Sequence, residues 1–234
     1  MEKLKNYVKS ELSGWKPLDV IWITIATAVI LALSIYWKDN WISLVAAVTG
    51  VLCVVLTGKG KRSSFVFGLV NTVMYAIVAL KAKYYGEVML NVLYYLPMNF
   101  VGFVAWTKHM NDDTGEVVKQ RLPFKKSIFI YLLTGIAIVV YGFILKKMGG
   151  NLPYIDSMST VVSVVAQVLS IKRLVEQWVL WIIVDIVTVI MWAVHFMQGG
   201  ESITTLAMWG VFLINAIVMF VRWYREAKRN EKQI

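Results

Sequence analysis

The sequence has little of the chemistry on which enzymes and disulfide-bonded domains depend. Its 234 residues include one cysteine, Cys53, and two histidines, His109 and His195. A single thiol excludes a disulfide framework or a thiolate metal site within one chain, and two histidines leave few other metal ligands. No phosphate-binding glycine loop and no serine triad can be found. We therefore expect no cofactor, no bound metal and no enzymatic activity.

Charged residues are also scarce, at 16% of the chain, whereas 59% of the residues are hydrophobic and the mean hydropathy is +0.65. A soluble domain of this size cannot bury so much apolar surface, so we expect an integral membrane protein. The net charge of +10 does not indicate nucleic-acid binding, because the basic residues lie in short clusters between apolar runs. The polar segment from Met1 to Lys16 lacks the pattern of a cleaved signal peptide.

The apolar runs predict eight membrane-spanning helices. Helices are favoured over barrel strands because the runs are continuously apolar, without the alternation that a strand facing a polar lumen requires. At a rise of about 1.5 Å per residue, runs of this length match a hydrocarbon core of about 30 Å, and only the sixth is short. The predicted spans are Leu18 to Trp37, Trp41 to Thr57, Ser64 to Leu80, Glu87 to Trp106, Ser127 to Leu145, Ser157 to Ser170, Trp178 to Met197 and Ser202 to Trp223.

The distribution of basic residues predicts the orientation. With the N-terminus in the cytoplasm, 19 of the 24 Lys and Arg residues lie on the cytoplasmic side and 5 on the other. This split follows the positive-inside rule, and an even number of spans then places both termini in the cytoplasm. The longest loop, Thr107 to Lys126, is rich in turn-forming residues and is expected to be a solvated connector between two halves.

An internal repeat is visible when the sequence is shifted by 117 residues. The shift aligns Met74-Tyr75-Ala76 with Met191-Trp192-Ala193, and it also aligns the polar stripes of the third and seventh spans. Because a three-helix repeat leaves its copy inverted, the fifth span is needed to bring the copies parallel. We expect an all-α membrane fold with one N-terminal helix and a 3+1+3 core. The predicted divisions are residues 1–40, 41–110, 111–150 and 151–234.

The seventh span carries the strongest candidate site. Trp178, Trp181, Asp185, Thr188 and Trp192 are spaced three and four residues apart and share one helical face. A carboxylate near the middle of a bilayer costs several kcal/mol, so it normally faces a protein interior or a wet cavity. Two duller alternatives stay open. Trp178 can belong to an interfacial aromatic belt, and Asp185 can form a structural ion pair or hydrogen bond with another helix.

Other spans offer polar side chains that could meet these residues near the midplane. Small and hydroxyl residues also let membrane helices pack closely, so packing is the alternative for several of them. Pro97 lacks a backbone donor and predicts a kink in the fourth span. The further candidates for substrate binding are Thr160 and Gln167 on the sixth span, Asn71 and Tyr75 on the third, Asn91 and Tyr95 on the fourth, and Asn215 on the eighth.

Two sets of residues resemble a known family. The first comprises Phe67-Gly68-Leu69-Val70-Asn71, Tyr75, Tyr85-Gly86-Glu87, Asn91, Tyr95, Gly102 and Trp106, and the second comprises Asp156-Ser157, Thr160, Gln167, Lys172, Glu176, Trp178, Trp181 and Asp185. From about Trp41 onward the chain is similar to the PnuC-type vitamin transporters of bacteria, whose best-known substrate is nicotinamide riboside. Where the family often has a glycine and aromatic pair before the closing Trp106, this chain has Gly102-Phe103, a mild departure.

The resemblance implies a transporter in the bacterial inner membrane, with an architecture similar to that of the SWEET sugar transporters. It implies facilitated diffusion of nicotinamide riboside by alternating access, followed by phosphorylation by a separate cytoplasmic kinase. Because Asp185 is the only acid placed deep in a predicted span, we expect no ion coupling. The alternatives are transport of thiamin or another nucleoside, an intramembrane enzyme that uses Asp185, and a scaffold that does not transport. Association into a homo-oligomer also stays open.

Overall fold

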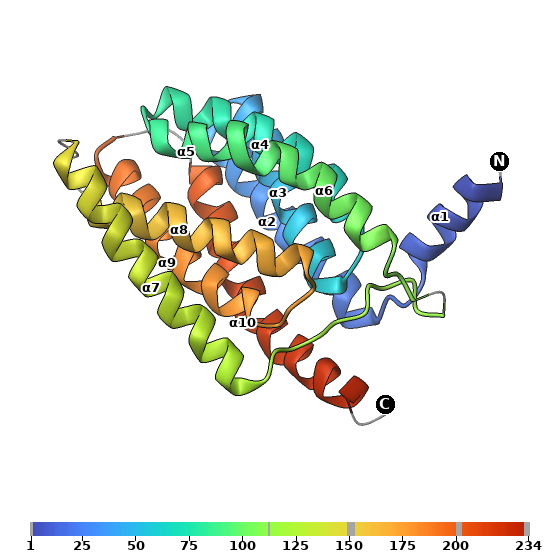
Figure 1. Ribbon diagram of the computed structural model, residues 1–234. Coiled ribbons are helices and arrows are strands. Elements are labelled where there is room, and N and C mark those ends of the chain that lie inside the picture. The colour runs from blue at the N-terminus through green and yellow to red at the C-terminus, as the bar shows by residue number, and fades with distance from the viewer. Residues whose placement is uncertain (1, 112, 149–152, 200–202, 232–234) are drawn as a thin grey trace.

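The computed structural model describes residues 2–111, 113–148, 153–199 and 203–231, and these residues form a helical bundle (Figure 1). The helices of the fourth span are nearly continuous and include a π-helical segment, η1. The elements in order are α1 (Glu2–Leu12), α2 (Pro17–Trp37), α3 (Trp41–Lys59), α4 (Ser64–Lys81), α5 (Tyr85–Met89), η1 (Leu90–Tyr95), α6 (Leu96–Thr107), α7 (Phe124–Lys147), α8 (Pro153–Ile171), α9 (Gln177–Met197) and α10 (Ile203–Glu231).

The predicted all-α membrane fold is confirmed. Seven stretches of the described chain are long and apolar enough to cross a membrane, with the stretch from α5 to α6 counted as one. The remaining predicted span is α8, whose apolar part, Ser157–Ile171, is shorter. The predicted start of the last span at Ser202 lies outside the described residues, and α10 continues past the predicted end at Trp223. Helix α1 was not predicted, because its sequence has no membrane-length apolar run.

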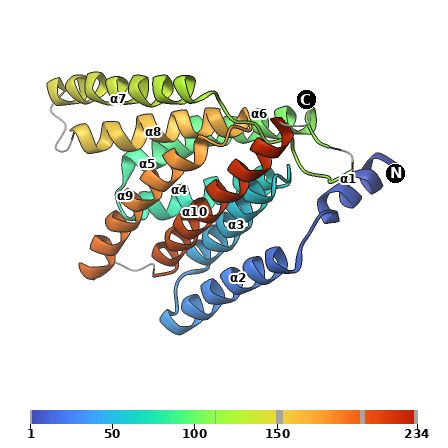
Figure 2. The same cartoon turned by 90° about the horizontal axis from the view of Figure 1, so that it is seen from below.

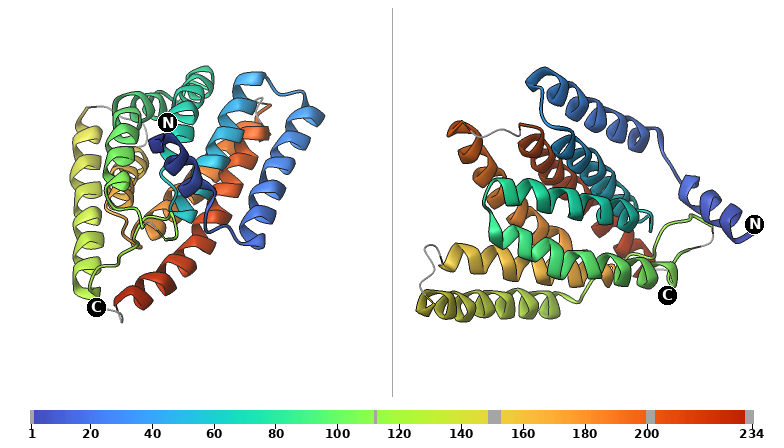
Figure 3. Two further views of the ribbon diagram at one scale, coloured as in Figure 1. Left: turned by 90° about the vertical axis from the view of Figure 1, so that its right-hand side faces the viewer. Right: turned by 90° about the horizontal axis from the view of Figure 1, so that it is seen from above.

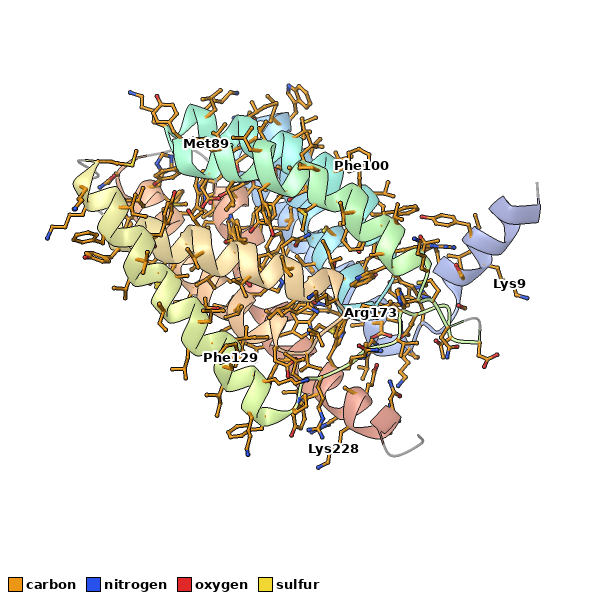
Figure 4. All side chains as sticks on the ribbon, viewed as in Figure 1. Lys9, Met89, Phe100, Phe129, Arg173 and Lys228 are labelled. Atoms are coloured by element: carbon orange, nitrogen blue, oxygen red, sulfur yellow. The ribbon has the colours of Figure 1, made fainter. Side chains whose placement is uncertain are left out.

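The outer surface of the bundle is apolar, as a lipid-facing surface requires. Phe100 on α6 and Phe129 on α7, both labelled in Figure 4, are 59% and 65% exposed. Helices α2 and α7 flank the bundle on opposite sides (Figures 2 and 3). Side chains of this kind would remain in contact with water in a soluble protein, whereas acyl chains solvate them in a bilayer.

The helices of the two predicted triplets contact one another reciprocally. Helix α3 packs against α10, and α8 packs against α6, so the first helix of each triplet meets the third helix of the other. Two residue pairs that are 117 positions apart are also in contact. The indole of Trp192 donates to the hydroxyl of Tyr75 at 3.0 Å, and the rings of Trp106 and Trp223 lie 6.2 Å apart. Residues related by a twofold axis touch only beside that axis, so these contacts are what the predicted repeat requires.

Both termini lie at one end of the bundle, which we call the terminal end (Figures 1 and 3). The long loop between α6 and α7 crosses this end; most of its described residues are exposed, as expected of a solvated connector, but part of it is buried against the bundle. Val117 and Lys119 of this loop are 2% and 3% exposed. The amide of Val117 donates to the carbonyl of Gly60 at 2.8 Å, and that of Val175 donates to the carbonyl of Gln120 at 2.9 Å. These backbone contacts tie the loop to both triplets.

Close packing between α4 and α6 gives a test of the fold. A Cβ atom at Gly102 would lie 2.2 Å from the ring of Phe65, which itself packs edge-on against Trp106. The ring cannot yield without disturbing that pair, so Gly102→Ala is expected to destabilise the protein by about 1–3 kcal/mol. Thermal unfolding of the detergent-solubilised protein measures the loss. Gly135→Ala on α7 is the matched control, because a Cβ there meets nothing within 4 Å. Equal melting temperatures for the two variants would contradict the expected overpacking.

Candidate functional site

A cavity lies inside the bundle, between the two predicted triplets. The space free of protein atoms within it is about 1000 Å³, a figure that includes open solvent. Helices α3, α4, α8, α9 and α10 and the fourth span all contribute to its wall. The polar and aromatic residues that line it are Cys53, Thr57, Phe65, Asn71, Thr72, Tyr75, Glu87, Asn91, Tyr95, Asn99, Ser163, Gln167, Ser170, Trp178, Trp181, Asp185, Trp209, Phe212 and Asn215.

Helix α9 supplies one of the two acids and two of the indoles. Trp178, Trp181 and Asp185 all line the cavity, as expected for residues spaced three and four apart on one helical face. Asp185 is 3% exposed, and no hydrogen bond or ion pair joins its carboxyl group to another described residue. The indole nitrogen of Trp178 is buried and also has no hydrogen-bond partner in the described part of the chain. Buried polar groups are rarely left unpaired, so both groups are available to a ligand.

The fourth span presents a second polar stripe to the cavity. Glu87, Asn91, Tyr95 and Asn99 follow one another at intervals of four residues, and all four line the wall. In a regular α-helix such a series rotates by about 40° at each step and leaves a common face. The π-helical segment Leu90–Tyr95 has more residues per turn, which removes part of this rotation. This π-helical segment ends two residues before Pro97, the residue for which the sequence predicts a kink.

Amide side chains line the wall contributed by α4, α8 and α10. The Asn71 amide nitrogen donates to the carbonyl of Ala46 at 2.8 Å, and that of Asn215 donates to the carbonyl of Val54 at 3.0 Å. Both bonds anchor the asparagines to α3 and fix where they face the cavity. Gln167 is 9% exposed, and its amide forms no hydrogen bond with another described residue. It is therefore the amide with the most freedom to meet a ligand.

Three of the predicted site residues do not line the cavity. The Thr188 hydroxyl donates to the carbonyl of Val184, one turn earlier on its own helix, at 2.9 Å. Trp192 is 1% exposed, and its indole nitrogen already donates a hydrogen bond to the hydroxyl of Tyr75. Thr160 lies one turn from Ser163 along α8 and is absent from the wall. The stripe on α9 continues past the cavity, and at this depth the ring of Trp192 packs against those of Tyr75, Tyr84 and His195. These three residues were predicted from helical spacing alone, which does not show how far along a helix the cavity extends.

Several residues that line the cavity were not predicted from the sequence. Glu87 is the most important of them, because the expectation of no ion coupling treated Asp185 as the only deep acid. Glu87 is the first residue of the predicted fourth span and was not counted among its deep residues, although it shares the four-residue interval of Asn91 and Tyr95. Trp209 and Phe212 of α10 also line the wall and gave no signal beyond an apolar run.

Aromatic side chains separate the cavity from the terminal end. Trp178, which lines the cavity, packs edge-on against Trp223 with ring centroids 5.5 Å apart. The indole of Trp223 donates to the carbonyl of Gly58 at 2.7 Å, and that of Trp106 donates to the carbonyl of Ser170 at 3.1 Å. Each bond joins the third helix of one predicted triplet to the first helix of the other. The aromatic layer therefore closes the cavity by joining the two halves.

Beyond this layer lies a closed ring of alternating charges, which we call the ion-pair ring. Lys59 contacts Asp19 at 2.9 Å and Glu116 at 2.8 Å, and Lys119 continues the ring from Glu116. The members in order are Asp19, Lys59, Glu116, Lys119, Glu226 and Arg222, which returns to Asp19. All six side chains are at most 20% exposed. The ring ties α2, α3, α10 and the long loop together at the terminal end.

Lys61 ties α1 to the same end. Its ammonium group donates to the carbonyls of Ser10 at 2.6 Å, Ser13 at 2.9 Å and Gly115 at 2.7 Å. Burial lowers the pKa of Lys61 to about 8. Helix α1 is thereby fastened to the tip of the long loop, next to the ion-pair ring.

Comparison with known proteins identifies the family. The family model described as nicotinamide mononucleotide transporter matches residues 40–225. The nicotinamide riboside transporter PnuC of Neisseria mucosa is 39% identical over 231 residues, which cover 96% of this chain and 88% of that protein. The protein of the same name from Haemophilus influenzae is 33% identical over 93% of this chain and 94% of its own length.

A solved structure agrees with the sequence matches. The crystal structure of the vitamin B3 transporter PnuC is similar with a TM-score of 0.86 and 39% identity, over 95% of this chain and 97% of the other. The resemblance inferred from the sequence motifs is therefore confirmed. With its helical spans and its central cavity, the chain belongs to the nicotinamide mononucleotide transporter family and is a multi-pass membrane transporter, not an enzyme.

Proposed function

We propose that the protein carries nicotinamide riboside across the bacterial inner membrane by facilitated diffusion, with both termini in the cytoplasm. The observation that carries this proposal is the cavity wall, which combines aromatic rings, amides and two carboxylates and contains no lysine or arginine. The relatives named as nicotinamide riboside transporters support it. A cytoplasmic kinase that phosphorylates the cargo would keep it inside the cell.

The wall suits a positively charged aromatic ring. Nicotinamide riboside carries a pyridinium cation, and tryptophan faces attract a cation by about 0.5 to 2 kcal/mol. Trp178, Trp181 and Trp209 line the cavity together with the carboxyl groups of Asp185 and Glu87. Neither acid has an ion-pair partner among the described residues, so a cationic cargo supplies the charge that the wall lacks. This charge complementarity favours passive carriage of a cation without a coupled ion.

Amide groups suit the rest of the molecule. The ribose hydroxyls and the carboxamide of nicotinamide riboside lose water on entering the cavity and need hydrogen bonds in return. Gln167 can supply such bonds, as can the unpartnered indole nitrogen of Trp178. Asn99 can only accept through its side-chain oxygen, because its amide nitrogen already donates to Thr72 and Tyr95. We propose that these residues, with Asn71, Asn91, Tyr95 and Asn215, form the substrate site.

The same wall predicts discrimination between the riboside and its phosphorylated form. Nicotinamide mononucleotide adds a phosphate dianion, and a like charge at about 4 Å costs roughly 4 kcal/mol at the effective dielectric constant of a partly hydrated site. The wall contains no lysine or arginine whose positive charge could offset that cost. In proteoliposomes, unlabelled mononucleotide is expected to compete with labelled riboside at least about a hundredfold more weakly than unlabelled riboside does. Equal competition by the two compounds would refute the proposed cargo.

Thiamin is the alternative cargo, because it is also an aromatic cation. It carries no ribose, so it cannot use the hydrogen bonds that the amides offer to the sugar hydroxyls. Uptake of labelled thiamin by the same proteoliposomes, inhibited by riboside only at high concentration, would assign the protein to thiamin.

A further inference from the structure

A second concave surface lies on the outside of the bundle, away from the cavity. It is a groove between the first turns of α2 and the last turns of α10, at the terminal end. Residues 218, 222, 225 and 229 are spaced four, three and four apart, so they follow one face of α10 along the groove. The groove changes character along this line, from apolar near Val218 to basic near Arg229.

The basic part of the groove holds more positive charge than the protein neutralises. Five cations and two acids line the groove, for a net charge of +3. Both acids, Asp19 and Glu226, belong to the ion-pair ring, where Arg222 is one of their partners. The other four cations are exposed, and none has an ion-pair partner among the side chains that the structure describes. They are Lys16, Arg225, Arg229 and Lys228, which is labelled in Figure 4.

The apolar part of the groove is exposed and continuous with the lipid-facing surface. Leu18 is 76% exposed, Ile217 49% and Val218 52%. Trp22 lies between the two helices, where its indole donates to the side-chain oxygen of Asn215 at 3.3 Å. The surface thus offers an apolar wall of acyl-chain character directly below a cluster of unneutralised cations.

We propose that this groove binds an anionic phospholipid of the phosphatidylglycerol class. The phosphate group lies among Lys16, Arg225, Lys228 and Arg229, and one acyl chain lies along the apolar side chains of α2 and α10. Basic pockets between membrane helices bind anionic lipid headgroups, and each basic side chain near the surface adds to the preference. A free phosphate ion could contact the cations but would leave the apolar wall without a partner. An acidic peptide could not contact the apolar wall, because membrane lipid covers that part of the surface.

Bromine-labelled lipids test the proposal because Trp22 lines the groove. The intact protein is reconstituted in phosphatidylcholine vesicles containing a small share of dibrominated phosphatidylglycerol or, separately, dibrominated phosphatidylcholine. The difference in quenching between the unmodified protein and Trp22→Phe measures contact between the brominated lipid and the groove. We expect brominated phosphatidylglycerol to quench Trp22 at a much lower mole fraction than brominated phosphatidylcholine does.

Charge variants provide the specificity control. The triple variant R225Q/K228Q/R229Q is expected to lower the preference for phosphatidylglycerol by about tenfold, because each cation contributes and salt screens part of the effect. The matched variant K108Q/K125Q/K126Q removes three exposed cations outside the groove and is expected to keep the preference. Lipid that co-purifies in detergent, quantified by mass spectrometry, gives a second readout that does not depend on Trp22.

Three outcomes would overturn the proposal. Equal loss of preference in both triple variants would reduce the effect to overall charge. Equal quenching by both brominated lipids in the unmodified protein would mean that the groove holds bulk lipid without selection. Protection of Trp22 from both lipids, together with a change of oligomeric mass in R225Q/K228Q/R229Q, would mean that a second copy of the chain covers the groove.

Discussion

Asp185→Asn is expected to weaken binding of nicotinamide riboside by about 10- to 100-fold. The carboxyl group lines the cavity and has no ion-pair partner among the described residues, so a cationic cargo is its natural counter-charge. A hydrogen bond or contact with a charged group contributes about 1.5–3 kcal/mol, and 1.4 kcal/mol is a factor of ten in affinity. Titration of the purified protein, followed by the fluorescence of the cavity tryptophans, measures the change directly.

Two comparisons separate binding from folding. Thr188→Val on the same helix removes a hydroxyl that bonds only within α9 and does not line the cavity, so its affinity should match that of the unmodified protein. A neutral nucleoside should lose less affinity than the cationic riboside in Asp185→Asn. If both ligands weaken equally, or if Thr188→Val weakens binding as much, the carboxylate does not recognise the charge of the cargo.

Lys119→Met is expected to destabilise the protein by about 3–5 kcal/mol, the usual cost of leaving buried charges without their partner. Lys119 is 3% exposed and lies between Glu116 and Glu226 in the ion-pair ring. Its loss leaves two acids facing each other across the gap. The double variant K119M/E226Q removes one neighbouring pair and keeps the remaining four charges balanced, so it should recover more than half of the lost stability. Thermal unfolding in detergent provides all the values of this double-mutant cycle.

The single variant Lys119→Met is also expected to open the cavity toward the terminal end. The chain's only cysteine, Cys53, lines the cavity, so its reaction with a small maleimide reports access without any engineered label. Because the ion-pair ring joins four segments across this end, Lys119→Met should raise the rate of Cys53 modification by about tenfold or more. Saturating nicotinamide riboside should slow the reaction in both proteins. An unchanged rate in a stably folded Lys119→Met would show that the ring does not limit access.

The spans and the stripe on α9 could be predicted because both depend on local periodicity. A run such as Trp178 to Met197 is apolar along its whole length, and the bilayer admits only a helix there. The three- and four-residue spacing of Trp178, Trp181 and Asp185 then places them on one face whatever the neighbouring helices do. The first turns of this stripe therefore reached the cavity as predicted, although its far end did not.

The differences between the predicted site and the cavity wall arise from long-range contacts and from a local change in helical geometry. Trp192 left the predicted site because Tyr75, 117 residues earlier, takes its indole hydrogen bond. Glu87 entered the cavity wall because the fourth span contains a π-helical segment, which keeps a four-residue interval on one face. A partner so far along the chain leaves no local pattern, and a four-residue interval predicts a common face only if the local change in helical pitch is known.

The amino-acid sequence by itself determined the membrane environment, the location of the apolar helical segments and the identity of one polar face, because these follow from apolar runs and helical periodicity. Only the tertiary structure decided where the cavity ends, which acids share it and how one end of the bundle is closed. The ion-pair ring illustrates the reason: Asp19, Glu116 and Arg222 lie on three separate segments, and their charges meet only after the helices have packed. Contacts of that kind depend on the positions of whole helices, which no local pattern encodes.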